Sequence, residues 1–115
     1  MAEFTQVART DELKSGMMKS VTAGGREILL ARVGDTYYAT DGRCTHMGGE
    51  LSRGTLDGTV VTCPRHGSQF DISSGKVIRW MKGGLVSKMA GVIKRPSNLT
   101  VYRVKVEDDR VLVKL

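Results

Sequence analysis

The stretch Cys44-Thr45-His46 is followed, after sixteen residues, by Cys63-Pro64-Arg65-His66, and together they hold both cysteines and both histidines of the 115-residue chain. Each stretch supplies one thiolate and one imidazole, and glycine follows both at Gly48-Gly49 and Gly67. Glycine lets the backbone approach a bound group closely and present N–H donors to it. Two cysteines are too few for a disulfide framework, so the pattern indicates a metal site.

Two metal centres compete for this donor set. A structural zinc site accepts two cysteines and two histidines in a tetrahedron, but zinc fingers usually place the cysteine pair before the histidine pair. Here the order alternates, which suits a two-iron cluster with both thiolates on one iron and both imidazoles on the other. A zinc-stabilised module that binds nucleic acid through a basic face remains an alternative. Two Phe, one Trp and three Tyr offer little for base stacking, so we expect no nucleic-acid partner.

The segments 44–54 and 63–71 resemble the two ligand motifs of the Rieske family, most closely those of soluble Rieske-type ferredoxins, and the closest match covers residues 41–78. The resemblance implies one [2Fe–2S] cluster, with Cys44 and Cys63 on the inner iron and His46 and His66 on the outer iron. It also implies surrounding residues that shape the cluster environment. These are Met47, Gly49, Pro64, Arg65, Gly67, Ser68 and Phe70.

The chain departs from the cytochrome bc type of Rieske protein at three positions. Gly49 and Arg65 stand where that type has two further cysteines joined in a disulfide. Phe70 stands where it has a tyrosine that donates a hydrogen bond, while Ser68 is retained. A missing donor favours the oxidised, less negative cluster. We therefore expect a reduction potential in the lower part of the family range of roughly −150 to +300 mV.

The rest of the chain predicts an all-β fold. Fourteen glycines and turn signals at intervals of 8 to 12 residues indicate short strands. We expect a Rieske-type antiparallel β sandwich as a base domain, in a single domain of residues 1–115, with a cluster-binding subdomain inserted at about 41–78. Strands are predicted at 4–8, 17–23, 27–33, 36–40, 59–62, 69–72, 76–78, 99–106 and 111–115, with a helical turn capped by Thr10 and a loop over 41–58.

Alternation of apolar and polar residues predicts which strand residues face the core. The predicted core residues are Val21, Ile28, Leu30, Val33, Tyr38, Val60, Val101, Val104, Val106, Val111 and Val113. One segment breaks the strand pattern, because apolar residues between 84 and 95 follow the spacing of one helix face. This short basic helix, within an insertion at 80–96, is expected either to pack on the sheet or to contact a partner or a membrane surface.

Charge is distributed unevenly along the chain. Eighteen Lys and Arg against twelve Asp and Glu give a formal net charge of +6, and residues 72–106 contain no acid. A basic half attracts acidic partners, so we expect redox partners with an acidic docking face. No apolar run reaches the roughly 20 residues of a membrane span, and residues 1–8 do not form a secretory signal. A cytoplasmic location is expected.

The resemblance implies a one-electron carrier rather than an enzyme. The carrier would accept electrons from a flavin or iron–sulfur reductase and deliver them to an oxygenase, as in a dioxygenase system, or to a similar terminal enzyme. No residue is assigned as an acid, base or nucleophile. A small subunit of a nitrite-reductase-like complex is the main alternative. A respiratory Rieske protein is disfavoured because the sequence lacks the disulfide cysteines and a membrane anchor.

Overall fold

The structure is a computed structural model that describes residues 4–43, 49–64, 67–79 and 98–115. The described chain is built of short antiparallel strands and two single-turn 3-10 helices, η1 (Thr10–Glu12) and η2 (Leu51–Arg53), so the all-β prediction is confirmed. The helix expected at 84–95 lies outside the described residues. The strands are β1 (Phe4–Arg9), β2 (Met18–Ala23), β3 (Arg26–Val33), β4 (Thr36–Asp41), β5 (Thr55–Asp57), β6 (Val60–Thr62), β7 (Gln69–Asp71), β8 (Val77–Arg79), β9 (Val101–Glu107) and β10 (Arg110–Lys114).

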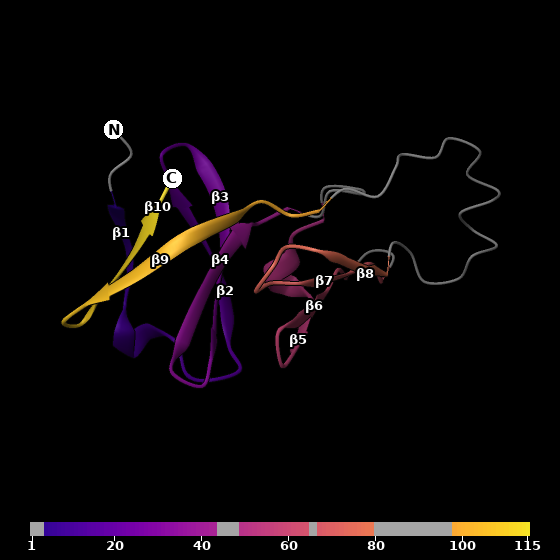
Figure 1. Cartoon of the computed structure of the whole chain (residues 1–115), viewed down its shortest axis with the longest axis horizontal. Helices are drawn as coiled ribbons and strands as arrows, with labels where there is room; N and C mark the ends of the chain where they lie inside the picture. The colour runs from indigo at the N-terminus through magenta and orange to yellow at the C-terminus, as the bar shows by residue number, and fades with distance from the viewer. Residues whose placement is uncertain (1–3, 44–48, 65–66, 80–97) are drawn as a thin grey trace, which may run out of the picture.

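The larger sheet has the strand order β1-β10-β9-β4-β3-β2. Its two halves are joined by a short β4–β9 ladder, which pairs Ala39 with Tyr102 and Thr40 with Val101. The sheet folds over at this ladder, so that its edge strands β1 and β2 come into contact (Figure 1). Side chains from both halves fill the space between them. This first core contains Ala8, Leu13, Val21, Ala23, Ile28, Leu30, Ala39, Tyr102, Val111 and Val113.

The smaller sheet, β5-β6-β7-β8, is a meander that lies beside the larger one (Figure 1). A second core joins the two sheets, and it contains Leu29, Ala31, Leu51, Val61, Cys63, Phe70, Ile72 and Leu99. Strand β3 belongs to both cores. Ile28 and Leu30 enter the first core while Leu29 and Ala31 enter the second, because successive strand residues point to opposite faces.

The core prediction is confirmed for Val21, Ile28, Leu30, Val111 and Val113, which are buried. Four further predicted residues, Val33, Tyr38, Val60 and Val104, are only partly buried. The prediction is wrong for Val101 and Val106, which are 40% and 46% exposed. Val101 is out of phase with the buried Tyr102, and Val106 lies near the exposed end of the β9–β10 hairpin.

Two local predictions also need correction. Thr10 does not cap the first helical turn, because Arg9 occupies the N-cap position and makes no side-chain cap bond. The loop expected over 41–58 contains η2 and strand β5. Within the residues that the structure describes, no helix is long and apolar enough to cross a membrane.

The double burial of β3 predicts different effects for two adjacent leucines. Leu29→Ala and Leu30→Ala should each lower the free energy of unfolding by about 2 to 5 kcal/mol, since both remove a fully buried side chain. Only Leu29→Ala removes a side chain from the second core. Trypsin should therefore cleave this variant first within the segment 53–79 under native conditions. Denaturant unfolding and mass spectrometry of the earliest cleavage products measure both effects. Identical first cleavage sites in the two variants would contradict the two-core description.

Candidate metal centre

The first candidate ligand loop, 44–49, is closed at its base by backbone pairing. Arg43 and Glu50 form an antiparallel β-bridge across it. The Leu51 N–H donates to the Gly42 carbonyl at 3.0 Å, and the Gly42 N–H donates to the Glu27 carbonyl at 3.0 Å. The loop is therefore tied to the beginning of β3.

The second candidate ligand loop, 63–68, is closed in the same way between β6 and β7. The Cys63 N–H donates to the Ser68 carbonyl at 2.7 Å, and the Gly67 N–H donates to the Cys63 carbonyl at 3.2 Å. Leu51, which follows the first loop, and Cys63, which begins the second, lie in the same second core. One apolar cluster therefore contains a described residue at one end of each loop.

The structure describes part of the predicted site. Cys63 is buried with 2% exposure, and Ser68 and Phe70 are fully buried. Gly49 is also buried, Gly67 is partly buried and Pro64 is exposed. The other predicted site residues lie outside the described residues, and these are Cys44, His46, Met47, Arg65 and His66.

The described residues fit an iron–sulfur cluster. An ionised thiolate is unfavourable in a buried position unless it binds a cation or a metal. Cys63 lies at the edge of an apolar cluster, on a loop with a fully buried hydroxyl at Ser68. Thiolate and imidazole are the ligands of a Rieske centre. Cys63 therefore offers the type of ligand that a Rieske centre takes on the thiolate side.

Charged side chains surround the base of the first loop as ion pairs. Arg43 donates from Nε and Nη2 to the two carboxylate oxygens of Glu27, at 2.7 and 3.1 Å. Arg53 Nε donates to Glu50 at 3.0 Å. This bond, followed by one from Ser52, lowers the pKa of Glu50. All of these pairs are exposed enough that each contributes little to stability.

The turn between β7 and β8 is hydrogen-bonded to the residues that precede β9. The Ser73 hydroxyl and N–H both donate to Asp71 Oδ1, and these bonds lower the pKa of Asp71. Gly75 has a φ of +78° and its carbonyl accepts from the Leu99 N–H at 2.8 Å. The Val77 N–H donates to Asn98 Oδ1 at 3.0 Å. Leu99 thereby lies in the second core, together with Leu51 and Cys63.

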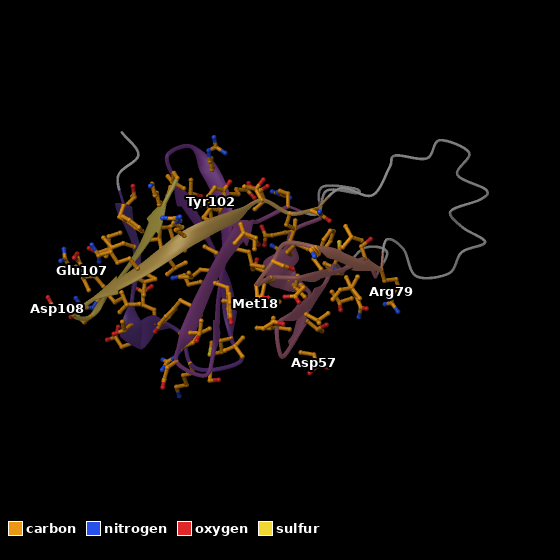
Figure 2. All side chains as sticks on the ribbon, viewed as in Figure 1. Met18, Asp57, Arg79, Tyr102, Glu107 and Asp108 are labelled. Carbon is orange, nitrogen blue, oxygen red and sulfur yellow. The ribbon has the colours of Figure 1, made fainter. Side chains whose placement is uncertain are left out.

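One contact at the second loop was not expected from the sequence. Arg79, at the end of β8, donates from Nε and Nη2 to the Gly67 carbonyl at 3.1 and 3.0 Å. Figure 2 shows Arg79 at the end of the smaller sheet, far from Glu107 and Asp108 at the tip of the larger one. An arginine twelve residues from its partner gives no local sequence signal, because the contact depends on the pairing register of β8.

Comparisons with known proteins agree with this arrangement. The family model described as "Rieske [2Fe-2S] domain" matches residues 3–89. A ferredoxin component of naphthalene 1,2-dioxygenase/salicylate 5-hydroxylase systems from Ralstonia sp is 34% identical over 112 residues, covering 97% of this chain and 95% of that protein.

Two solved structures share the fold. The ferredoxin of carbazole 1,9a-dioxygenase from Nocardioides aromaticivorans IC177 has a TM-score of 0.78 at 26% identity, covering 96% of this chain and 95% of that one. A ferredoxin solved in complex with the reduced oxygenase of carbazole 1,9a-dioxygenase has a TM-score of 0.77 at 31% identity, with coverages of 96% and 92%.

Two glycines with nearly equal φ test the importance of the β7–β8 turn. A Cβ on Gly75 would lie 2.2 Å from the Leu99 carbonyl oxygen, whereas a Cβ on Gly25, with a φ of +76°, would meet nothing within 4 Å. Gly25→Ala should therefore cost only the strain of a left-handed residue, about 1 to 2 kcal/mol. Gly75→Ala should cost clearly more, since backbone must also move. Thermal and denaturant unfolding compare the two, and equal losses would show that Gly75 is not crowded.

Proposed function

Since the chain belongs to the Rieske [2Fe-2S] domain family, we propose that it functions as a Rieske-type ferredoxin that carries one electron from a reductase to a terminal oxygenase. The observation that supports this proposal is the extent of the similarity. The matching ferredoxin component is aligned over nearly its whole length and nearly the whole of this chain. A ferredoxin of the same fold has been solved together with an oxygenase.

The proposal assigns the cluster to two loops. Cys44 and Cys63 supply the thiolates and His46 and His66 the imidazoles, from a cluster-binding subdomain of about residues 41–78 within a single domain. When bound, the cluster supplies reversible one-electron chemistry. The protein's own contribution is to hold the thiolate of Cys63 against an apolar core, on a loop closed by its own backbone bonds.

The chain has no catalytic role of its own in this proposal. Both histidines are used as iron ligands, so neither serves as an acid or base. The donor is a flavin or iron–sulfur reductase, and the acceptor is the oxygenase of a dioxygenase system in the cytoplasm. Substrate chemistry takes place on that oxygenase.

The partner surfaces are proposed to be acidic. Residues 72–106 contain no Asp or Glu, and within this span the described Lys76, Arg79 and Arg103 are exposed. Opposite charge accelerates encounter between proteins and orients them before contact. An acidic surface around the site where the acceptor receives the electron would therefore orient this carrier for docking.

Exchange of ferredoxins tests the carrier function. The purified holoprotein should replace the native ferredoxin in a naphthalene dioxygenase system, with its reductase and oxygenase present, and restore NADH-dependent substrate oxidation. The matched control is Cys63→Ser, which removes a thiolate and should abolish both the red-brown colour and electron delivery. A coloured wild-type protein that the reductase cannot reduce, or that cannot reduce any oxygenase, would contradict the proposal.

Ionic strength tests the acidic docking face. The rate of electron delivery to the oxygenase should fall, by on the order of tenfold or more, as salt rises from about 0.01 M to about 1 M and the Debye length shrinks from about 30 Å to about 3 Å. Reduction of cytochrome c, a basic acceptor, should instead accelerate with salt. The same salt response with both acceptors would exclude electrostatic docking.

A further inference from the structure

The second ligand loop is held from outside by a side chain of β8. Arg79 directs two donors, Nε and Nη2, at the single carbonyl oxygen of Gly67, at 3.1 and 3.0 Å. Gly67 has a φ of +76° and its N–H donates to the Cys63 carbonyl. Both polar groups of Gly67 therefore have partners, one within the loop and one on β8.

A register shift in β8 makes this contact possible. Phe70 pairs with Val77, but Gln69 pairs with Arg79, so Ile78 is an extra residue in the strand. Without the shift, Val77 and Arg79 would point to the same face, since side chains alternate with a period of two. The shift lets Val77 pack on the second core while Arg79 lies opposite Gln69. Bulges of this kind commonly redirect a side chain beside a functional site.

The row to which Arg79 belongs is polar. Thr62 on β6 pairs with Gln69 on β7, and Gln69 Nε2 donates to the Thr62 hydroxyl at 3.2 Å. Arg79 continues this row on β8. The neighbouring row, of Val61, Phe70 and Val77, faces the second core. Arg79 is therefore exposed on the polar face of the sheet.

We infer that Arg79 is a positioning residue for the cluster. It fixes the orientation of Gly67, whose N–H is bonded to the carbonyl of Cys63 in the same loop. It also places a permanent positive charge beside that loop. The inference rests on the proposed function, because it requires a cluster on these ligands. Reduction transfers one electron from the reductase to the site and makes it one unit more negative, so a nearby cation favours the reduced state.

Three variants of the holoprotein distinguish the effect of a cation at residue 79 from the effect of the protein's net charge. Arg79→Met removes the cation and the contact, whereas Arg79→Lys keeps the cation but not the planar two-donor geometry. The matched control is Arg103→Met, which removes the same charge from an exposed position on β9. The measurements are the midpoint potential, the visible circular dichroism of the cluster, and the half-life of the cluster against an iron chelator.

Arg79→Met should shift the reduction equilibrium toward the oxidised state at least threefold more than Arg103→Met, which is about 28 mV for a one-electron couple. It should also change the visible dichroism and shorten the cluster half-life. Arg79→Lys should keep a potential close to wild type but lose the cluster faster. Equal potentials and half-lives for the Arg79→Met and Arg103→Met variants would overturn the inference. If Arg79→Met yields no soluble protein, an Arg79→Lys variant identical to wild type in half-life would overturn it.

The readouts distinguish this inference from the proposed function. None of them involves a reductase or an oxygenase. Failure of electron delivery, with the Arg79 effects present, would overturn the carrier function and support the inference about the loop. A wild-type chain that binds no iron would overturn both.

Discussion

Burial of β3 on both faces is the constraint on which the rest of the structure depends. Residues 28–31 are all essentially inaccessible to water. Alternate side chains of this run contact the folded-over larger sheet on one face and the smaller sheet on the other. Each large side chain buried in this way contributes about 1.5 to 3 kcal/mol. Every strand of the smaller sheet has only three residues. This sheet therefore depends on contact with β3 to bury its apolar side chains.

The described ends of the two candidate ligand loops lie next to β3 and the second core. Leu51 and Cys63 bring one end of each loop into the second core. On the other side, Asp41 closes β4 immediately before the first loop, and Tyr102 on β9 donates to its carboxylate at 2.6 Å. Burial, and after it the hydrogen bond to Asp41, raises the pKa of Tyr102. Backbone bridges and these contacts hold the described ends of the candidate loops.

Much of the base domain could be predicted from the sequence, because its turns and strands are indicated by residues that are close together in the chain. The turns at Gly24-Gly25 and Gly34-Asp35 have positive-φ glycines between alternating strands, and these define the hairpins. The second core could not be predicted in this way. A strand buried on both faces reads as a continuous apolar run, so alternation alone assigned Leu30 to the core and omitted Leu29. Strand β5 and the register shift at Ile78 depend on pairing partners that are distant in sequence.

The charge pattern of the described residues links partner docking and the redox balance of the cluster in the proposed function. Among the described residues, most acids lie in ion pairs with a nearby arginine or lysine, as in Glu12–Lys19, Glu27–Arg43 and Glu50–Arg53. Such pairs largely cancel at a distance, because opposite charges a few ångströms apart produce a weak field beyond the Debye length. The positive charges of the span 72–106, which contains no acid, are compensated less. This span includes Arg79, beside the second candidate ligand loop. If the chain docks as we propose, the field that a partner meets and the field at the cluster share a source, so a substitution at Arg79 would alter docking and redox balance together, whereas one at Arg103 would alter mainly the former.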